Sequence, residues 1–319
     1  MAAISIGTLT DLEKVDYVRE GLAIAKPHLI YAQYGVKDRV AKREGKTRQW
    51  FRMTKLGTTT GTSGNFSGYQ IEVNTTGAPP TWTPATPADT TVTAQVDIYF
   101  GQGAEWNDAV DYTSFADIPS ELRKINFQQA AENKDKVVKG VVAAGTNVYY
   151  ANNRATRPDL LSTDQVDMND FFDAVTVLRN NDAPLIKGMY SAMCSANVIA
   201  QLMKDSTFQS AVQFQKDYIF AGTIAELYGV RFDFTSQAAT TTNGGSASQI
   251  ATIDQTIITG DNAYGVTAWM MNDFDMVLTN PGGFGDEWAV RHALAWKDSF
   301  KSVILNQSWL VRLESSRAA

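Results

Sequence analysis

The sequence predicts an α+β protein in which extended segments project from a mixed α/β body. Three observations lead to this prediction. Residues 56–120 contain no Lys or Arg and are rich in Thr, Gly and Pro, a composition typical of turns and strands. Residues 120–144 carry the pattern of one long helix, and from residue 162 onward helical and strand patterns alternate. With 319 residues, 44% of them hydrophobic, the chain is long enough to bury a sizeable core.

Composition argues against several classes of protein. A net charge of −6 is unlike that of a dedicated nucleic-acid-binding protein. No apolar run approaches the roughly 20 residues that span a bilayer, and the first residues lack the basic start and apolar core of a secretion signal. The single cysteine, Cys194, excludes an internal disulfide and is typical of a reducing compartment. We therefore expect a soluble protein made in a cytoplasm.

The N-terminal part is expected to be an arm followed by a basic stretch. Apolar residues recur with helical spacing from Leu12 to Leu22, and this pattern breaks near Pro27. The stretch from Lys37 to Lys55 then holds eight Lys or Arg residues and only two acidic ones.

The segment without Lys or Arg is expected to be a β-ribbon. It holds seven acidic residues, so its charge is opposite to that of the basic stretch. Within "TVTAQVDIYF", alternate residues place one apolar set on one face: Val92, Ala94, Val96, Ile98 and Phe100. A run of this length without a helix is unusual inside a compact domain, so we expect the ribbon to project from the body.

The long helix and the α/β part follow. Pro119 suits a first helical turn, and the apolar stripe of the helix, which includes Ile125, is modest, so a strut on a surface is expected. "DMNDFFDAVTVLRNND" predicts a helix with Asp167 and Asp170 at capping spacing. "GMYSAMCS" predicts a short buried strand, and "ANVIAQLMKD" predicts a helix.

The stretch "GTIAELYGVRFDF" predicts the end of a helix, a stop at Gly229 and then a strand with Val230, Phe232 and Phe234 on one face. A Gly/Ser/Thr-rich loop and the strand "IATIDQTIITG" come next. The C-terminal segment predicts two strands around Asn306 and Gln307. In the second of these, two sets of residues alternate: Trp309, Val311 and Leu313 with Ser308, Leu310, Arg312 and Glu314.

The sequence contains no recognisable catalytic, cofactor-binding or metal-binding motif. His28 and His292 are the only histidines, and each stands singly beside apolar residues, so structural roles are expected for both. Cys194 lies in an apolar strand without a nearby base, which favours a buried hydrophobic role. The acidic clusters "DQVDMNDFFD" and "MNDFDM" lack the glycine and glutamate of an EF-hand loop, and "GQGAEW" and "NPGGFGDE" match no nucleotide fingerprint. We therefore expect a structural protein and no enzyme.

Six stretches in order along the chain carry a resemblance to a known family. They are "AKPHLIYAQYGVKDRVAKREGKTRQWFRM", "AAGTNVYYAN", "MNDFFDAVTVLRNNDAPLIKGMYSAM", "IAELYGVRF", "TGDNAYGV" and "ALAWKDSFKSVILNQSWLVRLES". The chain resembles the major capsid proteins of tailed bacteriophages, in particular the coat-protein family of N4-like podoviruses.

The resemblance implies the tailed-phage capsid fold, which is shared with the capsid floor of herpesviruses. It implies an N-terminal arm over 1–46, an extended β-ribbon loop over 47–105 and a peripheral domain with a long spine helix over 106–165. An axial domain is implied over 166–285, with terminal strands over 286–319 that return to the peripheral domain.

As function, the resemblance implies a coat protein that assembles with itself as pentamers and hexamers into an icosahedral shell around double-stranded DNA. Scaffolding and portal proteins are implied partners, a decoration protein is a further one, and the virion is the implied location. A separate scaffolding protein is favoured because no long acidic helical region precedes the arm. We expect the acidic ribbon to contact a basic surface of a neighbouring subunit. The candidate residues are Arg39, Arg43, Lys46, Arg48, Glu72, Asp89, Asp97 and Glu105.

Some features depart from the family, and other functions stay open. Relatives often carry His-Pro where this chain has Cys194 and Ser195, and the ribbon has no lysine for a covalent cross-link between subunits. The basic stretch has a rival use as a weak, salt-sensitive contact with packaged DNA. The alternatives are an encapsulin-type nanocompartment shell, a virion decoration or carbohydrate-binding β-protein, and an unrecognised hydrolase.

Overall fold

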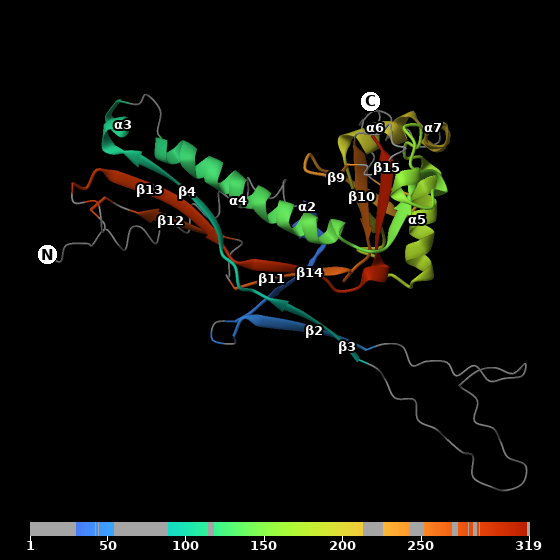
Figure 1. Ribbon diagram of the computed structural model, residues 1–319, viewed down its shortest axis with the longest axis horizontal. Helices are drawn as coiled ribbons and strands as arrows, with labels where there is room; N and C mark the ends of the chain where they lie inside the picture. Colours follow the sequence, from blue (N-terminus) through green and yellow to red (C-terminus); the bar gives the residue numbers. More distant parts are fainter. Residues whose placement is uncertain are drawn as a thin grey trace, which may run out of the picture. The chain divides into compact units, whose positions relative to one another are not determined.

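The computed structural model describes residues 30–41, 43, 45–53, 89–113, 118–212, 226–242, 252–269, 274–279, 281–282, 286 and 288–317 (Figure 1). The chain divides into two compact units, one of residues 48–93 and one of the remainder. The predicted helical arm, His28 and Glu72 lie outside the described residues.

The largest sheet is seven-stranded and of mixed direction. Its strands, in spatial order, are β5 (Val148–Tyr150), β15 (Leu310–Ser316), β10 (Ile253–Thr259), β6 (Tyr190–Cys194), β8 (Val230–Phe234) and β7 (Glu226–Leu227), with β9 (Ala239–Thr241) on β10. The β5–β15 and β6–β8 pairs are parallel, whereas β10 runs antiparallel to β15 and to β6. Every residue of β6 and β10 is buried. Burial was predicted for β6, whereas β10 was predicted only as a strand, because polar residues interrupt its apolar pattern.

Three smaller sheets complete the strands. They are the antiparallel set β12 (Asp275–Thr279), β13 (Arg291–Asp298) and β4 (Phe100–Asn107); the set β1 (Val36–Arg39), β11 (Tyr264–Ala268) and β14 (Phe300–Ile304); and the pair β2 (Thr47–Met53) and β3 (Asp89–Gln95). The described part of the smaller unit lies within the β2–β3 pair. Gly101 and Gly103 let β4 approach β13 closely, because a Cβ at Gly103 would lie 2.8 Å from the Cβ of Ala295.

The helices are α2 (Ile30–Tyr34), α3 (Asp108–Thr113), α4 (Ile118–Ala143), α5 (Met168–Asn180), α6 (Ala196–Lys204) and α7 (Ser206–Val212), with 3₁₀ turns η2 (Ala151–Asn153), η3 (Arg157–Asp159) and η4 (Gln307–Trp309). The predicted long helix is therefore confirmed as α4. It lies along β13 and β4 and also packs on β14 and α2 (Figure 1).

The expectation that α4 is only a surface strut was incomplete. Its inner face is buried through small and aliphatic residues, including Ala130, Val138 and Val142, while Ile125 is 58% exposed. Lys134 on the same face forms a buried ion pair with Asp298, whose carboxylate lies 3.8 Å from the Lys134 Nζ. The helix thus contributes to two buried hydrophobic clusters, and its buried charge hides this role in the sequence pattern.

The predicted helix end in "GTIAELYGVRFDF" is wrong in its described part. Glu226 and Leu227 form the strand β7, which pairs antiparallel with β8 through a two-residue turn. Tyr228 and Gly229 in that turn both have positive φ, at 53° and 80°. The glycine is left-handed as predicted, but it closes a hairpin. Phe234, expected on the inner face, is 54% exposed.

Two other strand predictions need correction. The strand expected over Thr91–Phe100 is divided: β3 ends at Gln95, β4 begins at Phe100, and Ile98 between them is 51% exposed. The C-terminal segment forms three strands, β13, β14 and β15, where two were expected. β15 lies inside the largest sheet, so residues on both of its faces are buried, including Leu310 and Glu314.

The main core lies between α5, α6 and the largest sheet. Phe171, Leu178, Val198 and Leu202 from the helices meet residues of β8, β10 and β15 in one buried cluster. The α5 prediction is confirmed in detail, because Asp167 caps the helix and forms a reciprocal capping box with Asp170.

Ser195, one of the departures from the family pattern, caps α6. Its Oγ accepts a hydrogen bond from the Val198 backbone N–H at 3.2 Å. We expect Ser195→Ala to lower the free energy of unfolding by about 1 kcal/mol, because the first turn of α6 loses this acceptor. Denaturant unfolding of the variant measures the loss, and Ser236→Ala, at an exposed turn, is the control. Equal stability of the two variants would contradict the capping role.

Candidate inter-subunit surfaces

The eight residues predicted for subunit contacts fall in several places. Arg39, at the end of β1, and Lys46, just before β2, are exposed. Arg43, between them, is also exposed and has a left-handed φ of 78°. These three cations therefore belong to one short connection between β1 and β2. That connection is accessible to a partner.

The remaining predicted residues are divided between the two compact units. Arg48 in β2 and Asp89 in β3 belong to the smaller unit, so this unit carries basic as well as acidic residues. Asp97 is exposed just after β3, and the neighbouring Val96 N–H donates to the Lys46 carbonyl at 2.8 Å. Glu105 is exposed on β4, in a different sheet. The structure thus brings Lys46 and Asp97 of one chain close together and separates Glu105 from them.

Exposed apolar side chains form a further set that the sequence analysis missed. On β2, Phe51 and Met53 are 58% and 65% exposed, and they alternate with the half-buried Arg48, Trp50 and Arg52. The period of two in "TRQWFRM" is the sequence signal that indicates this strand. Large exposed apolar side chains are typical of surfaces that another protein covers.

A second exposed set lies where β4 ends and β13 begins. Tyr112 on α3 and Trp288 before β13 are 88% and 87% exposed. The Asp108 N–H donates to the Val290 carbonyl at 3.1 Å, which joins the start of α3 to the loop before β13. Asp286 fixes that loop, because its carboxylate accepts the N–H groups of Gly282, Val290 and Arg291.

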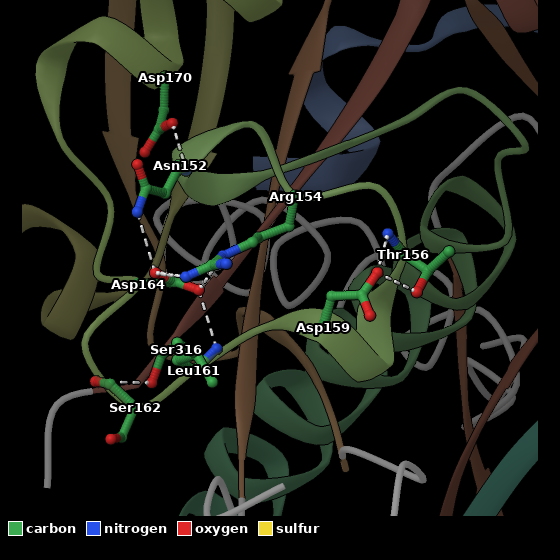
Figure 2. Close-up of polar contacts among 9 residues, drawn as sticks. All are labelled: Asn152, Arg154, Thr156, Asp159, Leu161, Ser162, Asp164, Asp170 and Ser316. Carbon is green, nitrogen blue, oxygen red and sulfur yellow. Dashed lines mark hydrogen bonds and ion pairs between the residues drawn. The ribbon is translucent and has the colours of Figure 1, made fainter. Parts of the chain in front are cut away.

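A polar network around the buried Asp164 joins residues 152–164 to one another in the connection between β5 and α5 (Figure 2). The Asp164 carboxylate accepts hydrogen bonds from Arg154 Nε at 2.7 Å, Arg154 Nη2 at 3.1 Å, Leu161 N–H at 2.8 Å and Asn152 Nδ2 at 3.1 Å. Burial alone would raise the pKa of Asp164, but these donors outweigh burial and hold the pKa below its ordinary value. The ion pair with Arg154 and the hydrogen bonds to Asp164 therefore stabilise this connection.

A cavity of about 350 Å³ lies where α2 and the start of β1 face β6 and β8. Its lining includes Tyr34, Ser191 and Arg231. Beside it, the Ser191 Oγ donates to Asp233 Oδ2 at 3.0 Å, and the Tyr34 hydroxyl donates to the same oxygen. Burial, and then the Asp233 bond, raise the pKa of Tyr34 to about 12, so the phenol stays protonated at neutral pH. These contacts hold α2 to the sheet.

Cys194 and His292, the described residues that were considered as catalytic or metal-binding candidates, lie in surroundings that suit structural roles. Cys194 is fully buried, and burial raises the pKa of its thiol. The expectation that His292 stands singly beside apolar residues was incomplete. Its Nε2 is hydrogen-bonded to Asp108, and its ring stacks on that of Trp106, with the ring centroids 5.3 Å apart. Within the described ranges no three His, Cys, Asp or Glu side chains are grouped as metal ligands. The helices described here also lack the length and apolar character needed to span a membrane.

Comparison with known proteins gives a match in structure. No family model matches the sequence, and no curated protein matches it. The capsid subunit of Cyanophage Pam1 superposes with a TM-score of 0.67 at 10% identity, over 87% of each chain. The capsid of Ralstonia phage GP4 gives a TM-score of 0.66 at 10% identity, over 91% of this chain and 92% of that chain. A virus-like particle from Pyrococcus furiosus gives 0.50 at 10% identity, over 93% and 96%. The chain therefore has the fold of phage capsid proteins, as the resemblance implied.

Proposed function

We propose that this chain is the major coat protein of a tailed bacteriophage and assembles with itself into an icosahedral shell around double-stranded DNA. One observation carries the proposal: the fold matches phage capsid subunits over about nine-tenths of this chain and of theirs. A match that spans about nine-tenths of both chains favours a shell subunit over an accessory protein with one shared domain. The virion is accordingly the proposed location, the protein is proposed not to be an enzyme, and the N4-like family stays a prediction.

The proposed roles of the segments follow the sequence analysis except for one strand. We propose α4 as the spine helix of a peripheral domain and the sheet of β6, β8 and β10 as the centre of an axial domain. β15 belongs to that same sheet, although the sequence analysis assigned it to strands that return to the peripheral domain. Pentamers and hexamers, a scaffolding protein, a portal, a decoration protein and weak contact with DNA remain parts of the proposal.

A nanocompartment shell is the second candidate, and the likeness to the Pyrococcus furiosus particle supports it. Both candidates require closed assembly through heterologous contacts. Electron microscopy of the purified chain, alone and co-expressed with its own scaffolding protein, tests this shared requirement. Closed shells or five- and six-membered rings are the expected result. A chain that stays monomeric in both cases would overturn the proposal. Shells filled with DNA distinguish the coat protein from a shell that encloses cargo proteins.

Charge reversal on the β1–β2 connection is expected to impair assembly. In Arg39→Glu/Arg43→Glu/Lys46→Glu, three exposed cations become anions on the surface proposed to receive an acidic segment of a neighbour. Because exposed ion pairs contribute only about 0.2–1 kcal/mol each, we expect slower and incomplete assembly with unchanged subunit stability. Light scattering during assembly measures the effect.

The matched control reverses three exposed lysines elsewhere, Lys124, Lys136 and Lys301. Equal assembly rates for the two triple variants would contradict the proposed steering. Normal shells that package less DNA, with a salt-dependent loss, would instead assign these cations to DNA contact.

A further inference from the structure

The first turn of α5 contains two aspartates whose side chains lie against each other. Asp167 Oδ1 accepts the backbone N–H of Asp170 at 2.9 Å, and Asp170 Oδ2 accepts the backbone N–H of Asp167 at 3.1 Å. Asp170 is only 4% exposed. A capping box usually pairs a Ser or Thr with a Glu or Gln, so two carboxyls in these positions place like charges together.

The second oxygen of Asp170 holds the connection that precedes the helix. Asp170 Oδ1 accepts the Asn152 backbone N–H at 2.9 Å, and Asn152 Nδ2 continues to Asp164 (Figure 2). Asn152 and Asn153 have left-handed φ values of 57° and 52°, a conformation that asparagine adopts more readily than most residues and that bends the chain here. Asp170 is therefore one of the contacts that keep this bend of the chain against α5.

Most charged groups that face the pair are negative. On α5 itself, Asp173 accepts the Tyr149 hydroxyl at 2.7 Å, and from the α6–α7 junction Asp205 accepts the Met168 N–H at 3.2 Å. Across the bend, Arg154 is bound to Asp164. Among the described residues, no ion pair joins a cation to Asp167 or Asp170.

Burial and the neighbouring Asp167 charge therefore act in the same direction on Asp170. Burial contributes most and raises the pKa of Asp170, the backbone N–H donors oppose it, and Asp167 raises the pKa further, to about 7. Below about pH 7 the Asp170 carboxyl therefore keeps its proton, and it can donate that proton to the adjacent Asp167 carboxylate in an O–H···O⁻ hydrogen bond.

We propose that the Asp167–Asp170 pair binds one shared proton and that its release to solvent loosens the bend at Asn152 from α5. Ionised Asp170 gains hydration and leaves the Asp167 charge when it turns toward water, and this movement gives up the Asn152 N–H bond. The proton thus controls how firmly the connection between β5 and α5 is attached. This property belongs to the single folded chain and does not depend on the proposed function.

The sign of the pH dependence of stability follows from how many protons the folded and the unfolded chain bind. The folded pKa of about 7 lies above the ordinary value of 3.8, so the folded chain binds more protons than the unfolded chain between these values. The stabilisation is fully present below about pH 4 and is lost as pH rises to about 7, where it levels off. Across this window the pair raises the unfolding equilibrium constant by at most about tenfold per pH unit.

Denaturant unfolding of the full chain between about pH 5 and pH 8 tests the proposal. In Asp170→Asn the amide cannot ionise, and its Nδ2 can donate to Asp167, so this variant is expected to lose the wild-type pH dependence over that range. Asp173→Asn removes an exposed carboxylate from the same helix and is expected to keep it. The same pH dependence in all three proteins would overturn the proposal.

Hydrogen exchange at the Asn152 amide measures opening of the bend itself, which a general change in the stability of the chain would not reproduce. After correction for the intrinsic pH dependence of exchange, protection of the Asn152 amide is expected to fall as pH rises toward about 7 and then to level off in the wild type, and to stay constant in Asp170→Asn. Constant protection in the wild type would overturn the proposed release. If Asp170→Asn does not fold, Asp167→Asn keeps the cap and removes the like charge, so the fall should move to lower pH. An unmoved fall would exclude the shared proton.

Discussion

Replacing Glu314 by Ala is expected to lower the free energy of unfolding by about 3–5 kcal/mol. Glu314 lies in β15 and is 0% exposed. Its carboxylate accepts Arg157 Nε and Nη2, each at 2.6 Å, and Gln255 Nε2 at 3.0 Å. Arg312 Nε lies 2.8 Å from the same group. Loss of the carboxylate leaves two partly buried guanidinium groups beside each other without their shared anion, and that is the source of the large cost.

Equilibrium unfolding in denaturant measures this loss, and two further variants provide comparisons for it. Glu314→Gln keeps an acceptor for one arginine and is expected to lose less. Asp275→Ala breaks a surface pair with Lys297, in which the side chains are 4.0 Å apart and both 48% exposed, and should cost less than about 1 kcal/mol. A Glu314→Ala variant no less stable than Asp275→Ala would show that the buried cluster does not hold β15 in place.

Glu314 also shows where reasoning from the sequence stops. Alternation along "WLVRLES" places it on the face opposite Val311 and Leu313, and for an edge strand that face would meet water. β15 instead lies between β5 and β10, so both of its faces are covered. Local periodicity does not show where a strand lies in its sheet. It also does not show that Arg157 of η3, 157 residues away in the sequence, binds Glu314.

Local signals performed well where the interaction itself is local. The capping spacing of Asp167 and Asp170 predicts the start of α5, and the structure confirms it. Tyr228 and Gly229 show the limit of such signals. A left-handed glycine serves a helix end and a hairpin turn equally well, and only the pairing of β7 with β8 decides between them.

The predicted contact residues depend on information that a single chain does not hold. Arg39, Arg43 and Lys46 are exposed, as an interface requires, but exposure alone does not identify the neighbour that covers them. The apolar side chains Phe51 and Met53 carry no charge, so the charge pattern of the sequence does not indicate them as contact residues. In interfaces, apolar anchors usually contribute more binding energy than rim charges, so the period of two in "TRQWFRM" is the more informative signal for contact residues.

Replacing Phe171 by Ala is expected to lower the free energy of unfolding by about 3–5 kcal/mol. Phe171 is 0% exposed, and its ring meets that of Phe232 edge-on, with centroids 5.1 Å apart. The two rings join α5 to β8 inside the main core, so truncation removes buried apolar area and leaves a cavity between a helix and a sheet that are fixed elsewhere. Denaturant unfolding measures the change.

Phe234, two residues beyond Phe232 on β8, provides the matched control. The sequence pattern places it on the same inner face, but it is 54% exposed, so Phe234→Ala should change subunit stability by less than about 0.5 kcal/mol. Comparable losses for Phe171→Ala and Phe234→Ala would mean that β8 continues into the core as the alternation predicts. A loss for Phe171→Ala alone would show that the inner face of the strand ends at Phe232. Any effect of Phe234→Ala would then have to appear in assembly, since this ring adds little to the stability of the free subunit.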